Sequence, residues 1–200
     1  MRLNLAERLM TNSPVRAFGQ KRIEAPMLRK FASRERYPLC LEIGCGRGVG
    51  AAIIVERFGA LEVIATDIDP AQIERARRRL KPALRGKVTF KVEDAMALSE
   101  PDGKFDAVFS FGVIHHSEDW RRAVGEVARV LKPGGEFFFE ELLAPFLGNF
   151  FIERLTAHPR GGRFTLREFE DGLRSAGLEV TGHRAVGNLI VFGAARKRPA

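Results

Sequence analysis

The chain has 200 residues, of which 45% are apolar and 29% are charged. This composition excludes a disordered or fibrous chain and suits one globular domain with a buried core. The net charge of +8 is concentrated in the first segment and around one helix, which indicates either anionic partners or solvated helix faces.

Two features of the sequence bear on where the protein works. Glu7 and Arg8 interrupt the N-terminus where a signal peptide needs an unbroken apolar core, and no later apolar run is long enough to span a bilayer. We therefore expect a cytoplasmic protein with no integral membrane segment. Cys40 and Cys45 are the two cysteines, and their spacing fits neither a disulfide framework nor a zinc site.

Residues 1–37 are expected to form a helical cap ahead of the first strand. They carry nine basic and three acidic residues. Ser13 followed by Pro14 is a helix start signal, and Pro26 interrupts the pattern that follows. One or two helices are therefore expected in this segment.

Short apolar runs alternate with helical patterns from residue 38 onward. Strands are predicted at 39–43, 62–66, 88–92, 105–111 and 136–141. Between them, Asp69 followed by Pro70 begins one predicted helix, and a second is closed by the Lys-Pro-Gly at 132–134. Strands that alternate with helices of this length predict parallel β-α-β units and a doubly wound sheet.

The last third of the chain departs from that alternation. Residues 142–164 are rich in phenylalanine and are predicted to be a lid-like insertion. Thr165 and Glu168 form a capping box that begins a helix ending at Gly177. The runs 178–186 and 188–197 have one residue between them, which only an antiparallel hairpin can accommodate.

Together these elements predict an α/β fold for residues 38–200. The expected architecture is a Rossmann-like, doubly wound, mixed seven-stranded sheet with an antiparallel final strand. Helices on both faces of the sheet would make a three-layer α/β/α sandwich.

A glycine-rich loop follows the first predicted strand, with the sequence Glu-Ile-Gly-Cys-Gly-Arg-Gly at 42–48. Doubly wound sheets bind ligands at the carboxyl end of a first parallel strand, where glycine lets the backbone approach the ligand closely. Gly46, Gly48 and Ala51 also satisfy a loose dinucleotide pattern. A nicotinamide-dependent oxidoreductase therefore stays open on the loop alone.

Five ordered motifs resemble those of class I S-adenosylmethionine-dependent methyltransferases, in particular the small single-domain, type 11-like ones. The first is the acid, one residue and G-x-G-x-G of the loop. The others are VIATDID at 63–69, VEDAMAL at 92–98, FDAVFSFGVIHH at 105–116 and VARVLKPGGEFFFEE at 127–141. The resemblance covers about residues 38–195. The antiparallel hairpin is similar to that family's final strands, whereas a dehydrogenase sheet would continue in parallel.

The resemblance implies S-adenosyl-L-methionine as the cofactor and no metal. Asp67, 23 positions after Gly44, would accept hydrogen bonds from both ribose hydroxyls. Asp94 and the backbone N–H of Ala95 would meet the adenine. The expected cofactor-binding residues are Glu42, Gly44, Cys45, Gly46, Gly48, Asp67, Ile68, Asp94, Ala95, Met96, Phe111 and Gly112.

The remaining residues of that set are expected to complete the cofactor site. Ile68 and Met96 would contact the faces of the adenine ring. Glu42 would orient the loop and the methionine ammonium, and Phe111 and Gly112 would line the methionine end.

Methyl transfer from a sulfonium is an in-line displacement, which an enzyme accelerates by aligning the nucleophile and excluding water. A base is needed only when the nucleophile must lose a proton. His115 and His116 follow the fourth strand beside the expected methyl position and are the candidates for that base, although neither is assigned. The Asn-Pro-Pro-Tyr-like sequence common in methyltransferases of base amines does not occur there.

The sequence thus predicts a methyltransferase acting on a small, hydrophobic or amphipathic acceptor. The apolar positions Phe146, Phe150, Phe151 and Leu155 would cover that acceptor, and Arg16, Lys21 and Arg22 would suit an anionic group on it. Two alternatives remain: an RNA or protein methyltransferase that uses the basic N-terminal surface, and a cofactor-binding protein without catalysis. Nucleic acid is the less expected partner, and the sequence leaves the oligomeric state open.

Overall fold

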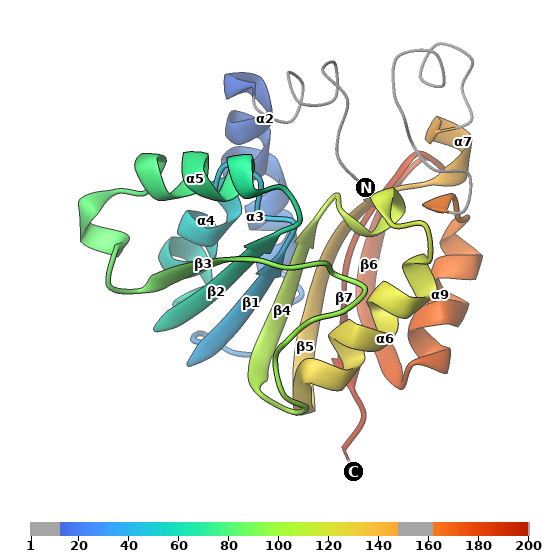
Figure 1. Cartoon of the computed structure of the whole chain (residues 1–200). Coiled ribbons are helices and arrows are strands. Elements are labelled where there is room, and N and C mark those ends of the chain that lie inside the picture. Colours follow the sequence, from blue (N-terminus) through green and yellow to red (C-terminus); the bar gives the residue numbers. More distant parts are fainter. Residues whose placement is uncertain (1–12, 148–161, 200) are drawn as a thin grey trace.

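The computed structural model describes residues 13–147 and 162–199. Within these ranges, seven strands form one mixed sheet with helices on both faces, as predicted (Figure 1). The strands are β1 (Leu39–Ile43), β2 (Glu62–Asp67), β3 (Val88–Val92), β4 (Phe105–Phe111), β5 (Leu131–Leu142), β6 (Leu178–Val186) and β7 (Ile190–Lys197).

The strand order places a crevice at the middle of the sheet. The order is β3-β2-β1-β4-β5-β7-β6, and β1 pairs in parallel with both β2 and β4. The connections after β1 and after β4 therefore leave in opposite directions, which is the switch point where doubly wound sheets bind ligands. The candidate site is expected there.

Helices cover each face of the sheet and bury a separate apolar core. The helical segments are α2 (Pro14–Gly19), η1 (Gln20–Glu24), α3 (Ala25–Arg29), α4 (Val49–Phe58), α5 (Pro70–Arg79), η2 (Pro82–Leu84), η3 (Ile114–His116), α6 (Trp120–Val130), α7 (Ala144–Leu147) and α9 (Leu166–Ser175). One core holds buried side chains of α3, α4 and α5, and the other holds those of α6 and α9. This arrangement confirms the three layers.

The first described helix is continuous through α2, η1 and α3. It begins where predicted, because the Ser13 side chain accepts a hydrogen bond from the backbone N–H of Arg16 at 3.0 Å. Pro26 lies in the first turn of α3 without ending the helix, after a π-helical segment at η1. The predicted cap over residues 1–37 stays a prediction, since residues 1–12 lie outside the described ranges.

The boundary between α6 and β5 differs from the prediction. The helix ends at Val130 and the strand begins at Leu131, so the Lys-Pro-Gly at 132–134 lies in the strand rather than closing the helix. Leu131 pairs with Phe105 and Glu136 pairs with Ala107, so a bulge absorbs the residues between them. Gly134 has φ +73° within that bulge.

The C-terminal elements form as predicted. Thr165 and Glu168 make a reciprocal capping box at the start of α9. The final hairpin is antiparallel, with β7 pairing against both β5 and β6. The lid-like insertion stays a prediction, because its apolar positions Phe150, Phe151 and Leu155 lie outside the described residues.

No helix within residues 13–147 and 162–199 is long and apolar enough to cross a membrane. The same ranges hold no cluster of three or more side chains suited to a metal ion. Cys40 and Cys45 are both buried free thiols.

Candidate cofactor site

The glycine-rich loop is held against the end of β2 by backbone hydrogen bonds. The N–H of Cys45 donates to the carbonyl of Thr66 at 2.7 Å, and the N–H of Gly48 donates to the carbonyl of Cys45 at 2.8 Å. Gly46 has φ +52°, and no atom lies within 4 Å of where its Cβ would be. The backbone at Gly46 is therefore open to a ligand.

Asp67 joins this loop to the start of α5. Its Oδ2 accepts from the N–H of Gly46 at 2.8 Å and its Oδ1 accepts from the N–H of Asp69 at 2.9 Å. Burial raises the pKa of Asp67, while these two hydrogen bonds oppose the change. Asp69 caps α5 by accepting from the N–H of Ala71 at 3.0 Å, which confirms its predicted structural role.

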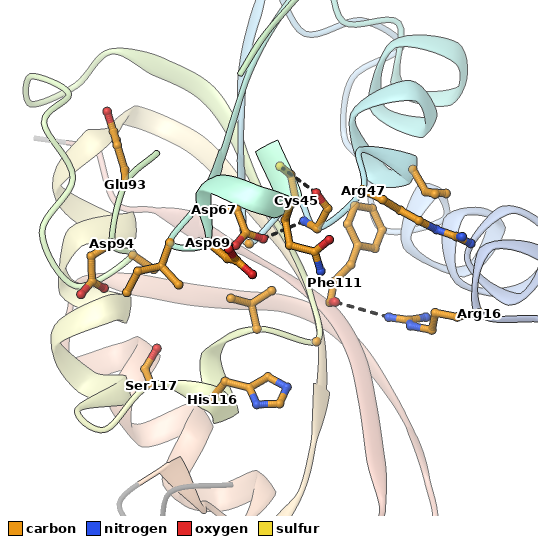
Figure 2. Close-up of a pocket in the computed structure, with 18 of the residues that line it drawn as sticks. Arg16, Cys45, Arg47, Asp67, Asp69, Glu93, Asp94, Phe111, His116 and Ser117 are labelled. Atoms are coloured by element: carbon orange, nitrogen blue, oxygen red, sulfur yellow. Dashed lines mark hydrogen bonds between the residues drawn. The ribbon is translucent and has the colours of Figure 1, made fainter. Parts of the chain in front are cut away.

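A tight turn follows β3 near the glycine-rich loop. Asp94 Oδ1 accepts from the N–H of Met96 at 2.9 Å, and its carbonyl accepts from the N–H of Ala97 at 2.9 Å. These bonds fix the turn that carries Ala95. Figure 2 shows Asp94 and Glu93 on one side of the pocket and the Cys45 loop with Asp67 on the other.

One pocket collects most of the residues that the sequence singled out (Figure 2). Those that line it are Gly44, Cys45, Gly46, Asp67, Ile68, Asp94, Ala95, Met96, Phe111, Gly112 and His116. Further lining residues that the sequence did not single out as cofactor contacts are Arg16, Gln20, Arg47, Val49, Asp69, Gln72, Glu93, Val113 and Ser117. Most of these lie within a few positions of a recognised motif, which is the signal that could have found them.

Glu42 and Gly48 do not line the pocket but lie behind its wall. A Cβ on Gly50 would lie 1.9 Å from Glu42 Oε1, so the carboxylate packs directly on the first turn of α4. Burial and the Asp67 carboxylate raise the pKa of Glu42 well above its usual range. Its Oε2 has no hydrogen-bond partner among the described residues. Gly48 packs against Ala76 and Phe90 instead.

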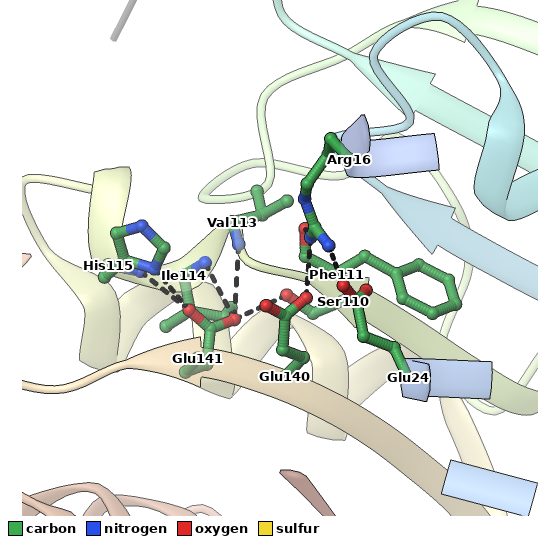
Figure 3. A network of polar contacts seen from close by, with 9 residues as sticks. All are labelled: Arg16, Glu24, Ser110, Phe111, Val113, Ile114, His115, Glu140 and Glu141. Carbon is green, nitrogen blue, oxygen red and sulfur yellow. Dashed lines mark hydrogen bonds and ion pairs between the residues drawn. The ribbon is translucent and has the colours of Figure 1, made fainter. Parts of the chain in front are cut away.

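The two histidines occupy different environments. His116 lines the pocket, whereas His115 is buried and does not line it, and the two ring centroids are 4.3 Å apart. His115 Nδ1 lies 2.7 Å from Glu141 Oε2 (Figure 3). Of the two candidate bases, only His116 is placed where it could meet a ligand in the pocket.

Glu141 is a residue that the sequence reasoning missed. Its carboxylate accepts from Ser110 Oγ at 2.6 Å and from the backbone N–H groups of Val113, Ile114 and His115 at 3.3, 3.1 and 3.3 Å. Burial raises its pKa to about 7, against the lowering effect of these donors. Glu141 thereby shapes the turn after β4 that forms one wall of the pocket.

Arg16 links the first helix to the carboxyl ends of β4 and β5 beside the pocket. Its guanidinium pairs with Glu24, donates to Glu140 Oε2 at 2.7 Å and donates to the carbonyl of Phe111 at 3.3 Å (Figure 3). Burial and the Glu140 carboxylate raise the pKa of Glu24 to about 9, although Arg16 lowers it. Glu24 and Glu140 therefore already occupy the Arg16 guanidinium, which counts against its predicted use for an anionic acceptor.

The pocket suits a ligand that combines hydroxyl and amine donors with an apolar ring. Asp67 and Asp94 present carboxylates, and Ile68 and Met96 lie beside them. The open Cα of Gly46 leaves room for a ligand at the loop, and the unpartnered Oε2 of Glu42 is buried behind that loop. These features fit the nucleoside and amino-acid parts of S-adenosylmethionine.

Comparisons with known proteins agree with this reading of the site. Residues 41–139 match the family described as the methyltransferase domain. The chain is similar to a 27-O-demethylrifamycin SV methyltransferase of Amycolatopsis mediterranei, with 34% identity over 145 residues, covering 70% of this chain and 53% of that protein. A demethylmenaquinone methyltransferase of Thermus thermophilus is 40% identical over 112 residues, covering 55% of this chain and 50% of that protein.

The fold has solved counterparts as well. A SAM-dependent methyltransferase from Aquifex aeolicus superimposes with a TM-score of 0.76 at 18% identity, covering 98% of this chain and 100% of that one. The chain spans about half the length of the two curated relatives. With the fold, the pocket and the family match in agreement, the chain belongs to the class I S-adenosylmethionine-dependent methyltransferases, whose cofactor is S-adenosylmethionine.

Proposed function

We propose that this protein transfers a methyl group from S-adenosylmethionine to a small, hydrophobic or amphipathic acceptor. One observation carries the proposal: ten of the twelve residues expected to bind the cofactor line a single pocket at the switch point of the sheet. The family match supports the same chemistry.

The residues divide the cofactor between two ends of the pocket. Asp67 would accept from the ribose hydroxyls with the lone pairs that Gly46 and Asp69 leave free. Asp94 and the backbone N–H of Ala95 would bind the adenine edge, with Ile68 and Met96 on its faces. Glu42 lies behind the loop, where it would orient the loop and, directly or through a water, the methionine ammonium through its unpartnered Oε2.

The cofactor, when bound, supplies an electrophilic methyl group, and the protein's own residues supply alignment and exclusion of water. Phe111, Gly112 and Val113 border the methionine end of the pocket, and Glu141 holds that turn in place. His116 faces the pocket and would accept a proton from an acceptor that must lose one. His115 acts on the turn rather than on the acceptor.

The relatives and the charges at the pocket support the proposed class of acceptor. The names of the two relatives refer to demethylrifamycin SV and demethylmenaquinone, both small organic molecules rather than macromolecules. Two arginines line the pocket, and both have protein partners: Arg16 pairs with Glu24 and Glu140, and Arg47 donates to the carbonyl of Ser13 at 2.6 Å. Lys21 and Arg22 do not line it. A mainly apolar acceptor is the simpler fit.

The test is incubation of the pure protein with methyl-labelled S-adenosylmethionine and cell extract, followed by separation into organic, aqueous and acid-precipitable fractions. Label in the organic fraction is the expected result. Label confined to the precipitate would contradict the small-molecule acceptor. Tight binding of S-adenosylhomocysteine with no label in any fraction would identify a cofactor-binding protein without catalysis.

A further inference from the structure

Three large apolar side chains of the first helix point into solvent. Val15 is 79% exposed, Phe18 is 63% exposed and Ile23 is 56% exposed. Single exposed apolar residues are normal on protein surfaces. Three within nine consecutive positions form a patch, and exposed apolar patches are typical of interaction sites. We call Val15, Phe18 and Ile23, with the neighbouring Lys21 and Arg22, the outer face of the first helix.

The same helix forms part of the pocket wall. Arg16 and Gln20 line the pocket, and Arg16 reaches the ends of β4 and β5 through Phe111 and Glu140. The outer face therefore lies on the solvent side of a helix whose other side closes the site. In Figure 1, α2 stands at the edge of the sheet where the parallel strands end.

Other exposed apolar side chains lie along that edge. Ile68 directly follows β2, and Val92 is the last residue of β3. Val186 and Leu189 are in the hairpin between β6 and β7, next to the pairing of Ile190 with Leu142 at the carboxyl end of β5. With the exception of Leu61, the exposed large apolar side chains of the described residues thus gather on the side of the molecule that holds the pocket.

The charge of the outer face is purely basic. Lys21 and Arg22 are exposed, and the Arg22 guanidinium lies 5.9 Å from the centre of the Phe18 ring. Glu24 is the one acidic residue between Pro14 and Glu24, and it is buried against Arg16 on the inner side. A helix with apolar and basic side chains on one exposed face is typical of binding at the surface of an anionic bilayer.

We propose that the outer face of the first helix binds an anionic lipid surface and so places the mouth of the pocket against the membrane. Phe18, Val15 and Ile23 enter the headgroup region, while Lys21 and Arg22 contact lipid phosphates. Nucleic acid is disfavoured as the partner, because phosphate binding alone does not need three large apolar side chains. Lipid binding is independent of the proposed function, whereas delivery of an apolar acceptor from the membrane rests on it.

The experiment is co-sedimentation of the full chain with vesicles of phosphatidylcholine alone or mixed with phosphatidylglycerol. Binding is expected only to the anionic vesicles, with loss at high salt. The double variant Phe18→Ser, Ile23→Ser should weaken binding by about tenfold or more, since each loses a side chain that is buried on docking. Lys21→Ser with Arg22→Ser should remove the preference for phosphatidylglycerol.

A matched control is Leu61→Ser, because Leu61 is 55% exposed but precedes β2 at the opposite edge of the sheet. It should bind vesicles as the wild type does. Absence of binding to anionic vesicles would overturn the proposal, and so would an equal loss of vesicle binding in Leu61→Ser. Salt-sensitive binding to RNA that the Phe18 and Ile23 changes leave intact would overturn it as well. Calorimetry with S-adenosylhomocysteine on every variant keeps a failure of lipid docking distinct from a failure of the cofactor site.

Discussion

The Nδ1 atom of His115 lies 2.7 Å from Oε2 of Glu141, and neither side chain reaches solvent. The same carboxylate accepts from Ser110 and from three successive backbone N–H groups, Val113 to His115. A single buried acid on β5 therefore determines the path of the chain after β4, where Gly112, Val113 and His116 border the pocket.

Replacement of Glu141 by alanine should destabilise the protein by about 3 kcal/mol, because several buried donors would lose their acceptor. Glu141→Gln should cost less, since the amide oxygen can still accept from the turn. Urea unfolding gives the free energies. Glu179→Ala, at an exposed position of β6, is the control, and a loss at Glu141 no larger than at Glu179 would contradict the structural role.

The raised pKa of Glu24 predicts a pH dependence with a definite sign. The pKa of this carboxyl is 4.5 in the unfolded chain and about 9 in the folded one. Its contribution to stability is therefore fully present below pH 4.5 and is lost as pH rises through about 9.

Glu24→Gln removes this titration and keeps a neutral side chain beside Arg16. From pH 5 to pH 9 the free energy of unfolding of the wild type should fall relative to that of the variant, by more than about 1 kcal/mol, the equivalent of one pKa unit. Urea unfolding at both pH values measures the difference, in which the contribution of Glu141 cancels. A difference that stays constant with pH would contradict the raised pKa.

Asp67→Asn should weaken binding of S-adenosylhomocysteine by about 30-fold, the effect expected when charged hydrogen bonds worth about 2 kcal/mol are lost. The amide still offers one oxygen to the N–H of Gly46 or Asp69, so the loop should keep its course. Isothermal calorimetry measures the affinity and circular dichroism checks the fold. Unchanged affinity would remove Asp67 from the cofactor site.

Gly46→Val should abolish cofactor binding by filling the space above the loop. Gly46 has φ +52°, so any side chain also adds backbone strain of about 1 kcal/mol. Gly103→Val is the matched control, because Gly103 has φ +64° and equally open surroundings but does not line the pocket. Both variants should lose similar stability, and only Gly46→Val should lose the affinity measured by calorimetry.

The sequence by itself determined the elements whose signals are local. Asp69 with Pro70 and the capping box of Thr165 with Glu168 act within one helical turn, so both helix starts were predicted correctly. The single residue between the last two runs required a hairpin on chain geometry alone. The motifs that follow successive strands also predicted most of the pocket residues, because parallel strands end at one edge of the sheet.

The tertiary structure decided what depends on distant partners. The end of α6 moved to Val130 because Leu131 pairs with Phe105 in the neighbouring strand, a contact that helix stop signals do not report. The sequence predicted that Arg16 could bind an anionic group, but Arg16 donates to Glu140, which lies 124 positions away in the chain. Burial and hydrogen bonding are properties of the packed chain. Only the tertiary structure could therefore show the different environments of His115 and His116 and the role of Glu141.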